Sequence, residues 1–268
     1  MTVMSLVSWE LRKLLAQIRV RVLLAVCVLG PLAMAVVLRA QSGLPKDTLF
    51  GRHVHESGFA LPLVVLGFAA TWAFPLLTSL VAGDLFAAED SLGTWGTLLT
   101  RSRSRAEVFA GKVLAAVVSA LVLLAVTALS SLLAGLVLAG GHPLTGLSGT
   151  PLPPGRAALL VLASWACAVP PLLGFTMLAC LLSIVSRSSV IGVGGPVVLG
   201  LLMQLLSLLG ALGLGTNLLL TTPFSAWHGL VRDDAYYGPL WQGTLVSLLW
   251  GLACLLPARR VLLTRDVT

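Results

Sequence analysis

Six long apolar stretches, none of which contains an ionisable side chain, constrain this chain more than any other feature of its sequence. A helix rises about 1.5 Å per residue, so roughly 20 apolar residues cross a hydrocarbon core of about 30 Å. Each stretch is long enough to do so, although the first only just reaches. The stretches cover residues 22–38, 57–82, 113–139, 157–186, 188–212 and 240–258. We therefore predict an all-α, polytopic membrane protein with six transmembrane helices.

The composition supports the same class and leaves little room for a soluble domain. Of 268 residues, 57% are hydrophobic and only 10% are charged, whereas soluble domains carry about 25% charged residues. No linker, charge run or repeat divides the chain, and the Gly- and Pro-rich region 140–155 is interpreted as a turn. We expect one transmembrane domain over residues 1–268. All four cysteines lie within apolar stretches, which favours buried thiols over a disulfide framework or a zinc site.

The basic residues predict the orientation of the chain, because Lys and Arg in short loops remain on the cytoplasmic side. Placing the N-terminus in the cytoplasm leaves twelve of the 17 basic residues inside, and both termini are then cytoplasmic. Basic residues retained in cytoplasmic loops account for the net charge of +7, so this charge does not indicate nucleic-acid binding. An alternative is a signal peptide cleaved after Ala33-Met34-Ala35, which would leave five spans. The amphipathic segment before the first stretch is longer than the usual start of a signal peptide.

Several kinds of chemistry are disfavoured by what the sequence lacks. Carriers driven by an ion gradient need ionisable groups within the membrane, and the six stretches contain none. Gly111-Lys112 lacks the remainder of a phosphate-binding loop, so neither ATP hydrolysis nor a bound cofactor is expected on this chain. His53 and His55 form an H-x-H pair without further metal ligands. Ser148, within Gly-Leu-Ser-Gly, leaves open an intramembrane serine protease, but the last stretch supplies no histidine to activate it.

The N-terminal segment has the pattern of an amphipathic helix. At 100° per residue one face is apolar, and a neighbouring face is polar with a net positive charge. The apolar face holds Met4, Val7, Leu11, Leu14 and Ile18, and the polar face holds Glu10, Lys13, Gln17 and Arg21. We predict a helix within residues 1–21 that lies in the membrane interface, with a plain cytoplasmic flank as the alternative.

The loop 83–105 is the longest internal connection and predicts a second short helix. Acidic Glu89 and Asp90 precede this helix and Arg101, Arg103 and Arg105 follow it, which complements the helix dipole at both ends. Leu92, Trp95 and Leu99 recur at helical spacing and predict one apolar stripe. Such a helix fits a groove of a partner protein. The alternative is that Trp95 and its neighbours rest on the lipid interface.

At these residues the sequence resembles the membrane subunits (permeases) of ABC type-2 exporters. The resemblance covers the order of parts along the whole chain: an N-terminal Trp9-Glu10-Leu11-Arg12-Lys13 segment, six spans, and a loop between spans two and three. The loop is similar to the family pattern E-x-x-x-G-T-x-x-x-L-L followed by S-R and G-K. It matches at Glu89, Gly93-Thr94, Leu98-Leu99, Ser104-Arg105 and Gly111-Lys112. Arg103 stands where the family often has Pro.

The resemblance implies a machine of two permeases, identical or paralogous, and two nucleotide-binding subunits that bind ATP and Mg. This chain would export a hydrophobic or amphipathic compound (drug, antibiotic, lipid or glycan) across the bacterial plasma (inner) membrane. An N-terminal elbow helix and a cytoplasmic coupling helix would carry the movement of the ATPase. The elbow residues are Trp9, Glu10, Arg12, Lys13 and Leu14. The coupling residues are Glu89, Asp90, Leu92, Gly93, Thr94, Trp95, Leu98, Leu99, Arg101, Arg103 and Arg105.

The same resemblance implies that the fifth span and the external segment 213–237 form the permease dimer interface and an external gate. Asn217, Pro223 and Phe224 are the candidate gate residues. The segment is either re-entrant and buried in protein, or an interfacial loop anchored by Trp227 and two tyrosines. Besides the exporter subunit, a membrane-bound enzyme and a non-transporting membrane scaffold remain as alternative functions.

Overall fold

Long helices account for nearly all of the secondary structure. The computed structural model describes residues 3–41, 49–95, 104–146, 149–210, 213–232 and 234–264. Within this part, six helical segments are long and apolar enough to cross a membrane, so the predicted fold class is confirmed. These segments are Ile18–Ala40, Ala60–Ser91, Arg105–Ala139, Pro154–Ser186, Ser189–Leu208 and Gly238–Thr264.

Two of the six segments are composite, because proline interrupts regular hydrogen bonding. The second consists of α3 (Ala60–Phe68), the π-helical turn η2 (Ala69–Ala73), α4 (Phe74–Ala82) and, after a turn, α5 (Ala87–Ser91). Pro75 lies in the first turn of α4 and has no N–H to donate, which favours the irregular turn before it. The fourth consists of α8 (Pro154–Cys167) and α9 (Val169–Ser186). It breaks at Ala168, just before two consecutive prolines.

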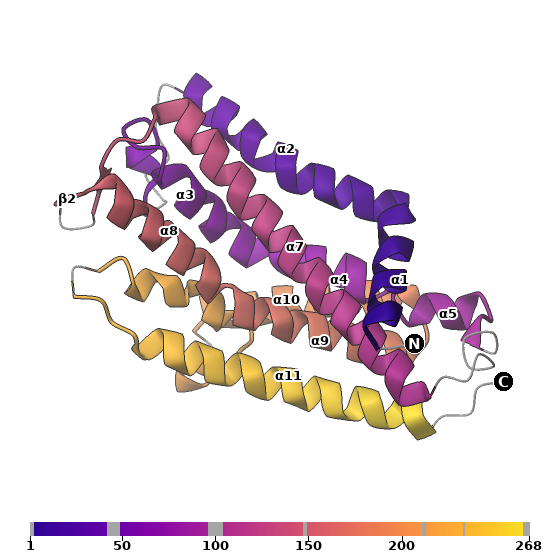
Figure 1. Cartoon of the computed structure of the whole chain (residues 1–268). Helices are drawn as coiled ribbons and strands as arrows, with labels where there is room; N and C mark the ends of the chain where they lie inside the picture. Colours follow the sequence, from indigo (N-terminus) through magenta and orange to yellow (C-terminus); the bar gives the residue numbers. More distant parts are fainter. Residues whose placement is uncertain are drawn as a thin grey trace.

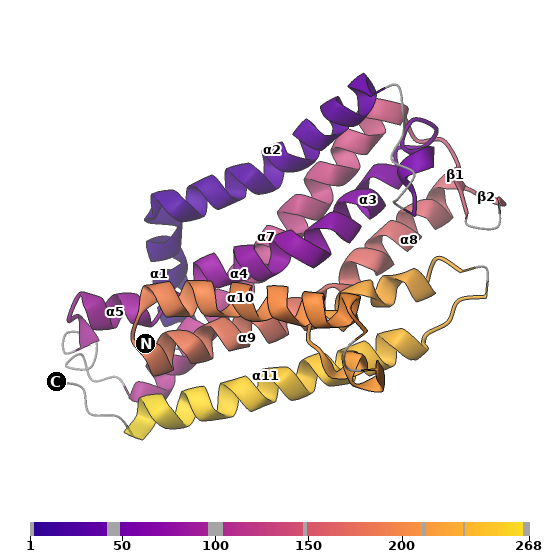
Figure 2. The same ribbon diagram turned by 180° about the vertical axis from the view of Figure 1, so that it is seen from behind.

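Helix α7 (Arg105–Ala139) runs through the middle of the bundle and contacts α3, α4 and α9 (Figure 1). The N-terminal pair α1 (Val3–Ala16) and α2 (Ile18–Ala40) packs on one side of α7. On the other side of the bundle, α9 packs against α10 (Ser189–Leu208) and α11 (Gly238–Thr264) (Figure 2). Helix α2 is therefore an edge element that meets the bundle through α7 and α1.

The two ends of the bundle differ in what they hold. At one end lie α5, the start of α1 and the end of α11, and we call this the termini end (Figure 1). The opposite end, which we call the hairpin end, holds the two-residue strands β1 (Leu144–Thr145) and β2 (Pro151–Leu152) and the single turn η1 (Gly51–His53). Both described chain ends therefore lie on the same side, as the even number of crossings requires.

Close backbone contacts between glycines fix how the helices meet at both ends. A side chain on Gly83 would overlap the backbone of Gly192, so the end of α4 crosses the start of α10 without intervening side chains. At the hairpin end the amide of Gly58 donates to the Gly140 carbonyl at 2.9 Å. A Cβ at Gly58 would come within 2.6 Å of the Gly135 oxygen. Small residues at crossings are how membrane helices approach closely.

Candidate functional site

A group of charged side chains at the termini end joins three helices, and we call Glu10, Lys13, Glu89 and Lys112 the ionic cluster. All but Lys13, which is half-buried, are buried. Lys112 of α7 is fully buried, and its Nζ lies 2.9 Å from Glu10 Oε1 and 2.9 Å from Glu89 Oε1. The same ammonium donates to the Leu85 carbonyl at 3.2 Å. Lys13 of α1 forms the second ion pair of Glu89. Two carboxylates and two ammonium groups balance in charge, which is the condition for burying them.

The local fold of α5 places Glu89 in this cluster. Helix α5 ends at Ser91, and Gly93 follows with φ +62°, a conformation that L side chains rarely adopt. The amide of Thr94 donates to the Glu89 carbonyl at 3.1 Å and that of Gly93 to the Asp90 carbonyl at 3.3 Å. These two bonds form a Schellman motif, which turns the chain back on itself. The Thr94 hydroxyl consequently donates to the second carboxylate oxygen of Glu89.

A second set of polar contacts holds the start of the same segment. Asp84 follows the Gly83 crossing and pairs with Arg19 in the first turn of α2. The Ser189 hydroxyl at the start of α10 donates to the other carboxylate oxygen of Asp84. The segment 84–94 is thus tied to the N-terminal helices at two of its three acids, with Asp84 paired to Arg19 and Glu89 to Lys13. Sequence reasoning missed these two ion pairs. A signal was present, because the spacing of Asp84 and Glu89 (five positions) is close to that of Lys13 and Arg19 (six positions).

The structure corrects the predicted coupling helix. Glu89 and Asp90 lie inside α5 rather than before a longer helix. Leu92 is 69% exposed and Trp95 only 4%, so these two residues do not share an apolar stripe. The physical reason is Gly93, whose positive φ ends α5 between them. Leu98, Leu99, Arg101 and Arg103 lie outside the described residues. Arg105 begins α7 and donates to the Leu263 carbonyl at 3.3 Å.

The N-terminal helix buries only part of the predicted apolar face. Its buried residues are Val7, Glu10 and Leu14, whereas Met4 and Ile18, expected on the apolar face, are 66% and 74% exposed. Glu10, expected on the polar face, is buried because Lys112 of α7 supplies its partner. Trp9 and Arg12 remain exposed, and Lys13 Nζ lies 5.5 Å from the centroid of the Trp9 ring. Whether this helix rests in a membrane interface remains a prediction.

Two adjoining cavities lie between α2 and the composite second segment, and together we call them the groove. The apolar cavity has a volume of about 410 Å³. Its lining includes Val26, Gly30 and Pro31 of α2, and Ala69 and Ala73 across from them. Thr127 of α7 also lines it, but its hydroxyl already donates to the Leu123 carbonyl at 2.7 Å. The apolar cavity therefore offers apolar contacts only.

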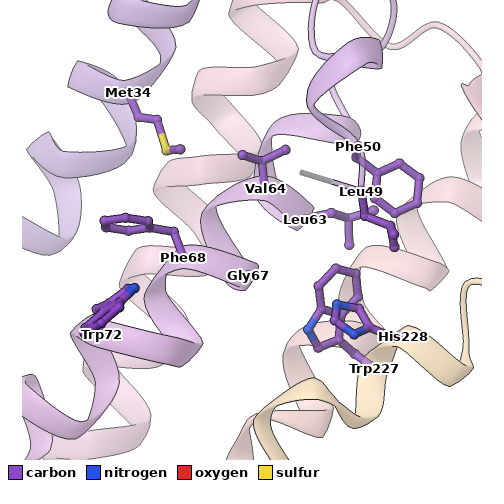
Figure 3. Close-up of a pocket in the computed structure, with 10 residues that line it drawn as sticks. All are labelled: Met34, Leu49, Phe50, Leu63, Val64, Gly67, Phe68, Trp72, Trp227 and His228. Atoms are coloured by element: carbon purple, nitrogen blue, oxygen red, sulfur yellow. The ribbon is translucent and has the colours of Figure 1, made fainter. Parts of the chain in front are cut away.

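The second cavity, which we call the aromatic cavity, has a volume of about 390 Å³ and shares Met34 and Phe68 with the first. The lining side chains converge on a common space (Figure 3). They are Met34, Leu49, Phe50, Leu63, Val64, Phe68, Trp72, Trp227 and His228, beside the backbone of Gly67. Phe68 precedes the π-helical turn and Trp72 lies within it. Both side chains are more than half exposed, so the groove opens at the side of the bundle. Sequence reasoning did not find this groove.

The candidate gate residues differ in their surroundings. Asn217 is exposed in the 3-10 helix η3 (Gly213–Leu218). Pro223 and Phe224 are buried in the next 3-10 helix, η4 (Thr222–Gly229). The ring of Phe224 lies 6.1 Å from that of Phe74 and 6.0 Å from that of Phe175. Since Phe74 and Phe175 belong to membrane-crossing segments, η4 is packed into the bundle, as the re-entrant alternative requires.

The alternative of an interfacial loop fits only the parts of the segment outside η4, because η3 has no buried residue and the residues before α11 are exposed. Trp227, one of its expected anchors, is 3% exposed and packs against His228 with ring centroids 4.2 Å apart. Tyr236 and Tyr237 are exposed near the start of α11. The irregular backbone of 220–229 is therefore covered by protein, while the tyrosines remain available to an interface.

The other chemistry considered from the sequence gains no support from the described part of the chain. Within it, no three His, Cys, Asp or Glu side chains come close enough to hold a metal ion. His53 pairs with Glu56 at 2.7 Å, and His55 Nε2 lies 2.9 Å from the Leu38 carbonyl. Ser148 lies outside the described residues. The four cysteines are buried and free, as predicted.

The chain matches the family described as "ABC-2 family transporter protein" over residues 6–203, well over half of its length. The matched region contains the ionic cluster, the segment 84–94 and most of the residues that line the groove. No curated protein matches the chain.

Proposed function

The chain belongs to the ABC-2 family of transporters, and from this premise we propose that it is the membrane subunit of an ATP-driven exporter whose ATPase is a separate polypeptide. The family makes the chain a membrane permease with a role in transport. ATP and Mg would bind the partner subunit, which contacts the termini end from the cytoplasm. A second permease, identical or paralogous, would complete the translocation path.

One observation carries the proposal: an exposed apolar turn is anchored on a buried ionic cluster. Leu92 projects from the termini end, while Glu89, three residues earlier, is 1% exposed and bridges α1 and α7. An exposed leucine beside a rigid anchor fits the groove of a partner protein. Movement of a partner bound at Leu92 would reach α1 and α7 through the two ion pairs of Glu89, and α4 through the chain itself.

The groove supports an exporter of hydrophobic or amphipathic compounds, which include drugs, antibiotics, lipids and glycans with lipid anchors. Cavities of about 300–1,000 Å³ lined by apolar and aromatic side chains are typical of small-molecule sites. The π-helical turn lines both cavities and is continuous with α4, which leads directly to the segment 84–94. A displacement of this segment would therefore alter the groove.

A substitution at the exposed turn tests the coupling role. The permease is co-expressed with the ATPase encoded beside it, and the complex is purified into nanodiscs. Leu92→Asp is expected to weaken association about 30-fold, since loss of a buried interface anchor costs about 2 kcal/mol or more. Leu92→Met, which keeps an apolar side chain, should associate normally. Copurification and substrate-stimulated ATP hydrolysis are the measurements, and equal values for both variants would refute the role assigned to this turn.

A further inference from the structure

We infer that the groove is the binding site for a long-chain amphiphile with an uncharged head group, with the chain in the apolar cavity and the head group in the aromatic cavity. The inference rests on the proposed function, because it names the class of compound that is exported. It assigns the site to a single permease, between α2 and the α3–η2–α4 segment.

The apolar cavity suits an aliphatic chain because its lining side chains are almost all apolar and the one hydroxyl among them is already hydrogen-bonded. The Thr127 hydroxyl is bonded within α7, and the Cys27 carbonyl accepts the Ser130 hydroxyl at 2.8 Å. The remaining lining side chains, from Val26 to Met34 on one side and from Val65 to Leu77 on the other, are apolar.

The aromatic cavity suits a head group because it brings hydrogen-bonding atoms to one end of the groove. Trp72 and His228 line it from opposite sides (Figure 3), and neither makes a side-chain hydrogen bond within the described part of the chain. Desolvation lowers the pKa of His228, which favours the neutral imidazole, and that form offers one donor and one acceptor. The indole of Trp72 adds a donor.

The head group is uncharged because the described lining of both cavities contains no Asp, Glu, Lys or Arg. A charged head group would lose part of its hydration without gaining a described charged partner, which is unfavourable. Hydroxyl or amide groups would instead bond to His228 and Trp72 and stack on the surrounding rings. The lateral opening beside Phe68 and Trp72 would admit such a molecule directly from the bilayer.

A photoreactive monoacylglycerol, carrying a diazirine in its chain, tests the site on the full-length protein in phosphatidylcholine nanodiscs. We expect saturable labelling of residues 26–34 and 65–77, mapped by mass spectrometry and displaced by unlabelled monoacylglycerol. The corresponding fatty acid, ionised at pH 8, should label at least tenfold less. Labelling that does not saturate and spreads evenly over lipid-facing α10 and α11 would mean annular lipid only and would overturn the inference.

Gly30 permits a variant that fills the apolar cavity without disturbing the fold. A Cβ at Gly30 meets no other atom within 4 Å, and Leu has a higher helix propensity than Gly. Gly30→Leu should therefore reduce labelling at least tenfold. Gly155→Leu is the matched control, since Gly155 also lies in a helix with open space around its Cα and does not line the groove. Unchanged labelling of Gly30→Leu would overturn the inference.

The head-group assignment has its own variant. His228→Phe preserves the ring packing against Trp227 and removes both hydrogen-bonding atoms, so the preference for monoacylglycerol over its dimethyl ether should disappear. The failure of the inference is distinguishable from that of the proposed function. Loss of ATPase coupling in Leu92→Asp together with normal labelling of Gly30→Leu would refute only the amphiphile site. The expected labelling pattern, with no effect of Leu92→Asp on the ATPase, would refute only the coupling role.

Discussion

Lys112 is the residue on which the termini end depends most. It is fully buried eight positions into α7, and its ammonium group is shared between Glu10 and Glu89. Removing one partner of a buried ion pair leaves an uncompensated charge, which costs more than the pair contributes. Glu10 already has one carboxylate oxygen, Oε2, that is buried without a hydrogen-bond partner, so this carboxylate is especially sensitive to the loss of its ammonium partner.

We predict that Lys112→Met destabilises the protein by about 3–5 kcal/mol, because Glu10 and Glu89 would remain buried with too little positive charge. The four buried free cysteines report unfolding directly through a thiol-reactive dye during heating. The double variant with Glu10→Gln should recover part of the loss. Arg259→Met, at an exposed position of α11, is the control and should change stability by less than about 0.5 kcal/mol. Equal melting temperatures for the two single variants would contradict this prediction.

At the scale of elements, the segment 84–94 is rigid because three separate interactions hold it along its length. Asp84 is held by Arg19, Glu89 by the ionic cluster, and the return of the chain by the Schellman motif at Gly93. Only Leu92 and its immediate neighbours face outward. Such an arrangement transmits displacement rather than absorbing it, which is what the proposed coupling role needs.

We predict that Gly93→Ala loosens this segment, because a residue with a Cβ pays about 1–2 kcal/mol in the left-handed conformation. A Cβ at this position meets no neighbouring atom, so the cost is in the backbone alone. Hydrogen exchange of the amides of 87–95 should become about 5- to 30-fold faster, as this free energy implies. Gly93→Asn should exchange closer to the wild-type rate, since Asn tolerates this conformation better. An alanine variant with wild-type exchange rates would show that the turn is held by other means.

At the scale of the whole molecule, six crossings and the common position of the two described chain ends allow only two orientations in the membrane. The excess of Lys and Arg near the termini end favours the cytoplasm for that end. The hairpin end, with η1 and the β1–β2 pair, would then face outward (Figure 1). The ionic cluster would lie next to the cytoplasm, where an ATPase partner has access to it.

Labelling with a membrane-impermeant maleimide checks this orientation. The native cysteines are buried, so a cysteine introduced at an exposed position is selectively reactive. We predict that Gly141→Cys, at the hairpin end, is labelled in intact cells. Ser91→Cys, at the termini end, should be labelled only after the cells are permeabilised. The reverse pattern would invert the topology and exclude a cytoplasmic partner at Leu92.

The sequence by itself determined the class of the protein, the six crossings and the common side of the termini. These depend on hydropathy summed over some 20 consecutive residues, which is a local property that neighbours in space do not change. The burial of the four cysteines also followed from the sequence, because each lies within an apolar stretch. The sequence also carried the family resemblance, because the order of parts and the spacing in the loop are properties of the chain.

Only the tertiary structure decided which polar residues are buried and where cavities lie. Periodicity alone places Glu10 on a polar face, but in the folded protein it is buried against Lys112. Lys13 likewise contacts Glu89, which is 76 positions away in sequence. Trp95 and Leu92 separate because one glycine adopts a positive φ. The groove exists because α2 packs on α7 beside an irregular π-helical turn. Ion pairs and cavities depend on which helices become neighbours, and periodicity within one segment does not contain that information.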